Sequence, residues 1–261
     1  MRASKGHETV LGEIFLRPPL SRRGWSQSGR GHVRIPNESD EFSLVWRRKT
    51  PDHSGTLIVD IYDHDSSLRG EGFGLLAGVD EAGRGPVAGP VVAAAVIMPE
   101  RLRIAGLRDS KKVPERERET LFRELLCLAA DIGVGIVGHE EIDRLNILNA
   151  TRLAMHSAIN DLRLTPDLVV IDAVTLPSLD IQQMSFFKAE SRSASVAAAS
   201  IIAKYVRDTI MIRYHDIYPV YNFRKNKGYC TAEHMEMIRL HGPSPIHRKS
   251  FRQVMSLQLP L

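Results

Sequence analysis

The segment LLAGVDEAGRGPVAGPVVAAAVIM, residues 75–98, contains two apolar runs separated by a turn rich in glycine and proline. The first run, residues 75–79, has the length and composition of a buried strand, and it ends at Asp80. Glycine and proline interrupt the pattern, and residues 91–98 then predict a second buried strand. This unit places two adjacent carboxylates, Asp80 and Glu81, at the end of a strand and just before a glycine turn.

Beyond this unit, apolar periodicity predicts helices that alternate with strands. Pro114 and the glutamates that follow it suit the first turn of a helix. We expect helices over residues 114–130, 140–163 and 194–213, and strands over residues 132–137, 168–171 and 183–188. Two strands followed by alternating helices and strands predict an α/β fold, in which a mixed sheet carries helices on both faces.

The composition divides the chain into two parts. The whole sequence is 43% hydrophobic and 25% charged with a net charge of +4, which excludes collagen-like and fully disordered classes. Residues 1–70 are only 30% hydrophobic, whereas the remainder is about 48% hydrophobic. We therefore expect residues 1–72 to form a largely disordered N-terminal extension and residues 73–261 to form a single folded domain.

Cysteine content and apolar run length bear on the compartment. The two cysteines, Cys127 and Cys230, are too few for a disulfide framework and too far apart for a CxxC metal site, which fits a reducing cytoplasm. No apolar run approaches the roughly 20 residues that span a bilayer, and Glu13 interrupts the only candidate for a secretory signal. We expect a soluble, cytoplasmic protein with no membrane partner.

Charge is distributed unevenly along the chain. Residues 71–199 carry a net charge of −4, whereas residues 200–261 carry +6. An ordinary solvated surface would account for this division. Alternatively, the basic part binds a polyanion while acidic groups in the first part perform chemistry on metal ions.

The acidic residues at strand ends are candidates for that chemistry. Asp172 ends another predicted strand, and sites in α/β sheets assemble at the carboxyl ends of strands. Asp80, Glu81 and Asp172 would repel one another there unless cations joined them. Mg²⁺ prefers such oxygen ligands, and two ions about 3.5–4 Å apart assist displacement at phosphorus. Solvated acids at strand ends are the alternative interpretation.

The turn Gly83-Arg84-Gly85-Pro86 matches neither the dinucleotide-binding nor the P-loop glycine pattern. Glycines nevertheless allow the backbone to approach a ligand closely, and Arg84 could contact phosphates. The ten histidines show no spacing typical of metal ligands. The turn thus predicts a close backbone contact with a ligand other than a dinucleotide.

GVDEAGRGPVAGPVVAAAVIMP, residues 78–99, closely resembles the opening of bacterial ribonuclease HII, the type-2 ribonuclease H family. The resemblance continues through DSKKV (109–113), EEIDRLNILNATRLAM (140–155), VVID (169–172), SVAAASIIAKYVRD (195–208), YPVYNFRKNKGYCT (218–231) and GPSPIHRKSF (242–251). It implies a ribonuclease H-like fold with a C-terminal helical extension. It also implies an endonuclease, dependent on Mg²⁺ or Mn²⁺, that cuts the RNA strand of RNA–DNA hybrids. Such enzymes nick 5′ of single ribonucleotides in duplex DNA and leave 5′-phosphate and 3′-hydroxyl ends.

The resemblance assigns metal binding and catalysis to particular acids. Asp80, Glu81 and Asp172 match the metal-binding carboxylates of the family. Glu190 stands at its fourth acidic position, where this chain has Lys-Ala-Glu instead of the usual Lys-Gly-Asp. The longer side chain keeps the charge but moves it by one methylene.

The resemblance also implies how the substrate is recognised. Gly83, Arg84 and Gly85 match the element that reads the ribonucleotide 2′-hydroxyl through the backbone, the group that distinguishes RNA from DNA. Tyr229 matches the tyrosine that packs against the sugar at the RNA–DNA junction, and Cys230 replaces a common glycine beside it.

Three further residues are candidates for phosphate contacts. The resemblance suggests Lys111, with a solvated loop as the alternative. Ser200 and Lys204 lie four residues apart on the Ala-rich helix and face one way, although helix packing would equally explain Ser200. The expected partners are RNA–DNA hybrids and ribonucleotide-containing duplex DNA, bound by a monomer.

Two alternatives to ribonuclease HII remain. Ribonuclease HIII carries an N-terminal substrate-binding domain of similar length to the extension, although the low apolar content of the extension argues against a folded domain. A non-catalytic hybrid-binding module is the other alternative, should Glu190 fail to complete the site. Strong activity on long hybrids with none on a single embedded ribonucleotide would favour ribonuclease HIII. Binding without cleavage at any divalent-metal concentration would favour the non-catalytic module.

Overall fold

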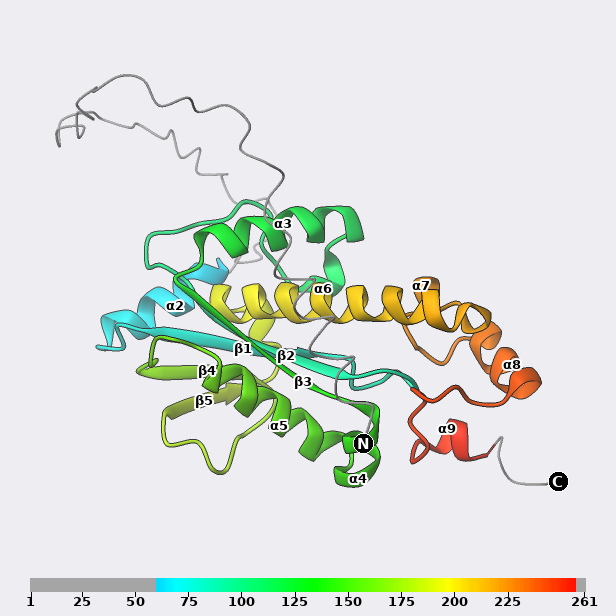
Figure 1. Cartoon of the computed structure of the whole chain (residues 1–261). Coiled ribbons are helices and arrows are strands. Elements are labelled where there is room, and N and C mark those ends of the chain that lie inside the picture. The colour runs from blue at the N-terminus through cyan, green and yellow to red at the C-terminus, as the bar shows by residue number, and fades with distance from the viewer. Residues whose placement is uncertain (1–59, 257–261) are drawn as a thin grey trace, which may run out of the picture. The chain divides into compact units, whose positions relative to one another are not determined.

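The computed structural model describes residues 60–256, and residues 1–59 and 257–261 lie outside the described part (Figure 1). A five-stranded sheet has the order β3-β2-β1-β4-β5. Its strands are β1 (Leu76–Ala82), β2 (Val91–Ile97), β3 (Asp131–Val137), β4 (Leu168–Asp172) and β5 (Gln182–Phe186). β1, β2 and β3 pair antiparallel, whereas β4 pairs parallel with both β1 and β5. The predicted mixed sheet is confirmed.

Helices cover both faces of this sheet (Figure 1). α6 (Ala194–Ile217) crosses one face with α3 (Glu115–Leu128) beyond it, and α5 (Ile147–Asn160) packs on the other. Because both faces are covered, β2 is buried along its entire length. This arrangement confirms the predicted α/β architecture.

Glycines allow the helices to approach the strands closely. A Cβ atom added to Gly78 on β1 would lie 2.1 Å from the carbonyl carbon of Ser195 on α6. On the opposite face, a Cβ added to Gly135 on β3 would lie 2.0 Å from the carbonyl oxygen of Ala154 on α5. Any larger residue at these positions would push a helix away from the sheet.

The single helix predicted over residues 140–163 is wrong. The structure has α4 (His139–Leu145) and then α5, which begins after a break at Asn146. Asn146 has φ of 68°, and its side chain accepts a hydrogen bond from the Asn149 amide at 3.1 Å. Asparagine tolerates this left-handed conformation and caps a new helix, so the apolar stripe continues across two helices.

The predicted extension also ends too late. Residues 61–70, expected to belong to it, form the helix α2 (Ile61–Gly70). Leu68 is 4% exposed and packs in one cluster with Leu76 and Val196. Asp65 is buried and accepts hydrogen bonds from the Ser195 amide and hydroxyl at 2.9 and 2.8 Å. Average hydropathy concealed this helix because only two of its side chains are buried.

The C-terminal segments form a second small core beside the glycine turn. Short elements follow α6 in the order η3 (Pro219–Tyr221), α7 (Phe223–Asn226), α8 (Ala232–His241) and α9 (Arg252–Met255). Tyr221, Phe223 and Ile246 pack there against Val87 and Ala88 of the turn. None of the helices between residues 60 and 256 is both long and apolar enough to cross a membrane.

Candidate active site

Acidic residues of β1 and β4 meet at one edge of the sheet. The two strands are parallel and stay in register up to Val79 and Ile171, so Asp80 and Asp172 follow on neighbouring strands. Neighbouring strands lie about 4.8 Å apart. The structure therefore brings together two of the predicted metal-binding carboxylates, and Glu81 follows directly.

Left-handed backbone at two strand ends brings Glu190 to the same edge. Ala173 after β4 has φ of 53°, and Lys188 after β5 has φ of 61°. Lys188 precedes the short helix η2 (Ala189–Ser191), whose Ala189 amide donates to Asp172 Oδ1 at 3.0 Å. Non-glycine residues with a left-handed backbone are strained, and such residues are concentrated at functional sites. Here they turn the chain so that Glu190 lies beside Asp172.

Burial and neighbouring negative charge raise the pKa of Asp80, Glu81 and Glu190. Burial raises the pKa of Asp80 well above its usual value, and the charges of Glu81 and Asp172 add to this rise. The Glu81 amide and the Ser200 hydroxyl donate to Asp80 and act in the opposite direction. Burial also raises the pKa of Glu190, with the charge of Asp172 adding to it. The cluster carries more negative charge than its surroundings offset.

The chemistry of this cluster fits a divalent cation. Burial raises the pKa of Glu81, although Arg84, 3.2 Å from its carboxylate, lowers it. Oε2 of Glu81 and Oε2 of Glu190 are both buried without a hydrogen-bond partner. Hard, anionic and partly unsatisfied oxygens are the donors that Mg²⁺ and Mn²⁺ take. Between residues 60 and 256, however, no three acidic, histidine or cysteine side chains are already arranged to hold a metal ion together.

The loop before α3 reaches the cluster through a serine pair and a lysine. In η1 (Ser110–Lys112), the hydroxyl oxygen of Ser110 lies 2.7 Å from that of Ser200, and Lys111 Nζ lies 4.0 Å from Glu190 Oε1. Burial lowers the pKa of Lys111, but the charges of Asp80 and other nearby carboxylates outweigh burial and raise it. Lys111 therefore carries a positive charge beside the carboxylates. Ser200 is only 3% exposed, and this burial argues against the predicted phosphate contact.

Two buried arginines anchor the glycine turn from beneath. Gly83 has φ of 102°, and a Cβ there would lie 2.1 Å from Arg207 Nε. Arg207 donates to the carbonyl oxygens of Pro90 at 3.1 Å, Lys227 at 3.0 Å and Ala88 at 3.3 Å. Burial lowers its pKa to about 10. Arg207 therefore stays protonated at neutral pH while its guanidinium is held by backbone carbonyls.

Arg248 makes the corresponding contacts from the C-terminal segment. It donates to the carbonyl oxygens of Gly83 at 2.6 Å, Arg84 at 3.1 Å and Gly89 at 2.9 Å. Burial, and then the charge of Arg207, lowers its pKa to about 9. Two carbonyls of the turn thus point inward, toward a protonated guanidinium.

Tyr229 lies at the mouth of this turn. Its side chain is 44% exposed, and a Cβ added to Gly85 would lie 3.8 Å from its ring. Lys204 Nζ and the Arg207 guanidinium lie 5.9 and 5.8 Å from the ring centre. The structure therefore brings the predicted residues Gly85, Lys204 and Tyr229 together.

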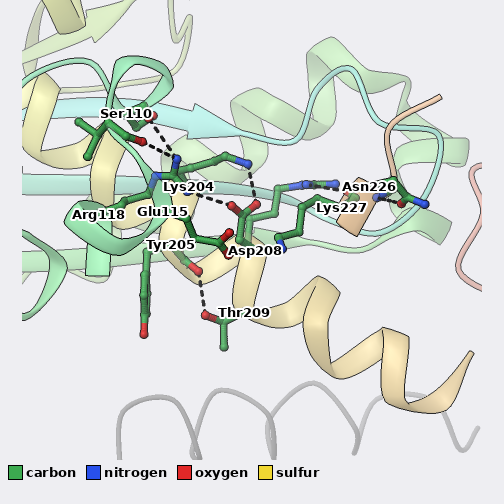
Figure 2. A network of polar contacts seen from close by, with 12 residues as sticks. Ser110, Glu115, Arg118, Lys204, Tyr205, Asp208, Thr209, Asn226 and Lys227 are labelled. Atoms are coloured by element: carbon green, nitrogen blue, oxygen red, sulfur yellow. Dashed lines mark hydrogen bonds and ion pairs between the residues drawn. The ribbon is translucent and has the colours of Figure 1, made fainter. Parts of the chain in front are cut away.

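Lys204 is oriented by a polar network along α6 (Figure 2). Asp208 accepts from Lys204 Nζ at 2.6 Å and from Arg118 at 3.2 Å. Arg118 also donates to the carbonyl oxygens of Ser110 and Val113. Burial lowers the pKa of Lys204 although Asp208 opposes this. The network links the Lys204 side of the site with the loop that carries Lys111.

Sequence reasoning missed three residues of this site, namely Asp109, Arg207 and Arg248. Asp109 is 6% exposed and accepts from the Lys111 amide at 2.9 Å, so it shapes the lysine loop. All three residues lie inside the segments that resemble ribonuclease HII. This resemblance is the sequence signal that could have identified them. The sequence alone does not show whether an arginine is buried or exposed to solvent, because residue type and spacing are the same in both cases.

Comparison with known proteins agrees with this geometry. The family model for ribonuclease HII matches residues 77–254. Ribonuclease HII of Bacillus velezensis is 53% identical over 200 residues, 77% of each chain, and that of Bacillus subtilis is 48% identical over 200 residues, 77% of this chain and 78% of the relative. The crystal structure of ribonuclease H2 from Pyrococcus horikoshii OT3 has a TM-score of 0.62 at 29% identity, covering 70% of this chain and 97% of that one. A Bst-RNase HIII structure in complex with Mn²⁺ has a TM-score of 0.58 at 22% identity over 70% of this chain and 68% of its own, which supports the fold alone.

The fold and these relatives define a ribonuclease H, an enzyme that cuts the RNA strand of RNA–DNA hybrids. Within that class, the family match and the close bacterial relatives distinguish type 2 from type 3. The chain belongs to the ribonuclease HII family. The predicted family is confirmed, and the ribonuclease HIII alternative has support only from the shared fold.

Proposed function

We propose that this ribonuclease HII also nicks duplex DNA on the 5′ side of a single embedded ribonucleotide, and that it leaves 5′-phosphate and 3′-hydroxyl ends by two-metal hydrolysis. One observation carries the proposal. Asp80, Glu81, Asp172 and Glu190 meet at one sheet edge, and Arg84 of the glycine turn contacts Glu81 at 3.2 Å. A cleaving centre and an element suited to reading a sugar therefore adjoin each other.

Asp80, Glu81 and Asp172 would hold two divalent ions, Mg²⁺ or Mn²⁺, with Glu190 assisting. When bound, such ions lower the pKa of an attacking water and stabilise the leaving oxygen. The chain keeps the carboxylates aimed, because the Ala189 amide donates to Asp172 and the Ser200 hydroxyl donates to Asp80. It also stores mutual repulsion that cation binding relieves.

The glycine turn would recognise the ribonucleotide through its backbone. The carbonyls of Gly83 and Arg84 point toward Arg248, and in a planar trans peptide the following N–H points the opposite way. The N–H groups of Arg84 and Gly85 are therefore directed away from Arg248, where they can meet a 2′-hydroxyl. Tyr229 beside Gly85 would pack against the sugar at the RNA–DNA junction.

Basic residues around the site would contact phosphates. Lys111 lies beside Glu190 and Lys204 lies beside Tyr229, and the side chain of Arg84 in the turn is 42% exposed. These contacts position the duplex without reading its sequence. We further propose that the enzyme acts as a cytoplasmic monomer, which fits its two free, exposed cysteines.

The test is a nicking assay on the full chain. Three labelled substrates, a duplex DNA with one ribonucleotide, the matched all-DNA duplex and an RNA–DNA hybrid, are incubated with Mg²⁺ or Mn²⁺. We expect a nick 5′ of the ribonucleotide, cleavage of the hybrid and no cut in the all-DNA duplex. Asp80→Asn should lower the rate about a thousandfold, as several kcal/mol of metal-derived stabilisation are lost.

A matched control is Glu236→Gln, an exposed acid on α8 paired with Arg239, which should leave the rate unchanged. No nick at a single ribonucleotide, with the hybrid still cut, would remove the proposed specificity. Binding of the hybrid without cleavage at any metal concentration would favour the non-catalytic module. A nick that survives Asp80→Asn would place the active site elsewhere.

A further inference from the structure

His234 and His247 form a buried pair behind Tyr229. Both residues are 0% exposed. Their Nε2 atoms lie 3.0 Å apart. At one end of the pair, His234 Nδ1 lies 2.8 Å from the Tyr229 carbonyl oxygen. At the other end, the Ser244 amide nitrogen and the Ser244 hydroxyl oxygen each lie 2.8 Å from His247 Nδ1. The four residues form a continuous hydrogen-bonded chain.

The two ends of this chain determine where every ring proton lies. The Ser244 amide can only donate, so His247 Nδ1 accepts and the neutral ring carries its proton on Nε2. His247 Nε2–H then donates to His234 Nε2, which leaves the His234 proton on Nδ1. That proton is donated to the Tyr229 carbonyl, which can only accept. Both rings are therefore neutral, each in one tautomer.

A charged ring is disfavoured by the same geometry. An additional proton on either ring would set two N–H donors against each other, between the Nε2 atoms or at the Ser244 amide. The rings of Tyr221 and Phe223 pack against both histidines.

Few groups offset a charge on the pair. Glu233, adjacent to His234 on α8, favours its protonation but is exposed and paired with Lys225. His139, at the start of α4, and Arg248, beside His247, supply no negative charge that would offset a proton on the pair. Burial thus lowers the pKa of His234, and it lowers that of His247 to about 4.

The pair bears on the site through Tyr229. The Tyr229 carbonyl also accepts from the Thr231 amide at 2.9 Å, and the Tyr229 ring lies beside Gly85 of the glycine turn. His247 itself bridges to Ala88 of the same turn. The histidine chain therefore fixes the backbone of Tyr229 relative to the turn that it faces.

We propose that His234 and His247 are positioning residues that, as a neutral relay, hold Tyr229 where it meets the ribonucleotide. They set the affinity for the junction and leave the hydrolytic step unchanged, because neither contacts a carboxylate of the cluster. This inference rests on the proposed role of Tyr229 in substrate binding.

The first experiment measures kcat and KM for the single-ribonucleotide duplex in two backgrounds. His234→Leu removes the donor to Tyr229, whereas the amide of His234→Asn can replace Nδ1–H. We expect His234→Leu to raise KM about tenfold with kcat within about twofold, as for one lost hydrogen bond, and His234→Asn to restore most of the affinity. With Tyr229→Ala present, both substitutions should change KM less than about twofold.

An unchanged KM in a folded His234→Leu protein, or an equal effect in the Tyr229→Ala background, would overturn the proposal. The second experiment needs no cleavage. Nitrogen NMR of the full chain at pH 7 should show protonated Nδ1 in His234 and protonated Nε2 in His247. Other tautomers would overturn the relay even if His234→Leu does not fold. Correct tautomers in a wild-type protein that fails to nick would instead locate the failure in the proposed function, and the positioning role would be lost with it.

Discussion

Acidification from pH 7 to pH 5 should destabilise this enzyme through His247. Burial, and then His234, lowers the pKa of His247 from 6.5 to about 4. Between these values the unfolded chain binds a proton that the folded chain does not, so stability falls as pH falls. The full difference corresponds to about 3 kcal/mol, of which about 2 kcal/mol is lost between pH 7 and pH 5. The lowered pKa of His234 acts in the same direction.

Urea unfolding at pH 7, 6 and 5 measures this effect. Wild-type protein should lose about 2 kcal/mol more than His247→Gln between pH 7 and pH 5, because glutamine does not titrate. His241→Gln is the matched control, since His241 is exposed at the end of α8, and it should follow the wild type. Parallel losses in wild type and His247→Gln, within about 0.5 kcal/mol, would refute the reasoning.

Four further outcomes are expected. Gly78→Ala should destabilise the fold by about 3 kcal/mol in urea unfolding, because the new Cβ lies 2.1 Å from α6 backbone; Gly70→Ala, with nothing within 4 Å, should change little. Asp80→Asn should raise the melting temperature of the metal-free protein at pH 7, since burial and neighbouring charge raise the pKa of Asp80 and its ionised form destabilises the fold; added Mg²⁺ should narrow this gap. Arg248→Lys keeps the positive charge but loses the several N–H donors of the guanidinium that hold the turn. KM for the single-ribonucleotide duplex should therefore rise about tenfold, with hybrid cleavage less affected. Leu68→Ala should cost about 3 kcal/mol because this side chain is 4% exposed.

Opposite results have distinct meanings. Equal stability of the two glycine variants would mean that α6 moves freely over the sheet. A lower metal-free melting temperature for Asp80→Asn would mean that the carboxylate is stabilised where it lies. Equal losses on both substrates for Arg248→Lys would deny the turn a special role at the ribonucleotide. A Leu68→Ala protein as stable as wild type would place α2 outside the cooperative unit.

The strands β1, β2 and β4 were predictable because almost fully buried strands produce unbroken apolar runs. Residues 91–98 and 168–171 stand out in this way, and each ends where the chain turns. Asp80 and Asp172 could be placed on one edge because each ends such a run. The resemblance to ribonuclease HII added the predicted roles of the remaining residues, which single-chain patterns do not specify.

Other features depend on tertiary contacts that have no local signature. Asn146 interrupts a regular apolar stripe through its own backbone conformation. Asp65 is buried because Ser195, far along the chain, donates to it twice. The buried state of Arg207 and Arg248 follows from backbone carbonyls around them, whose direction is decided only by the folded turn. Polar and charged residues are usually expected to be exposed to solvent, but Asp65, Arg207 and Arg248 are buried.

The anchoring of Gly83 by Arg248, 165 residues later, has a consequence for synthesis of the chain. A growing polypeptide folds from its N-terminal end as it emerges, and contacts so distant in sequence form last. The sheet that carries Asp80 and Asp172 is complete in sequence before the segment with Arg248 has been made. A nascent or prematurely ended chain can therefore assemble its carboxylates while the turn above them still lacks its anchor. If the turn recognises the ribonucleotide as proposed, selectivity would be the last property that the growing enzyme acquires.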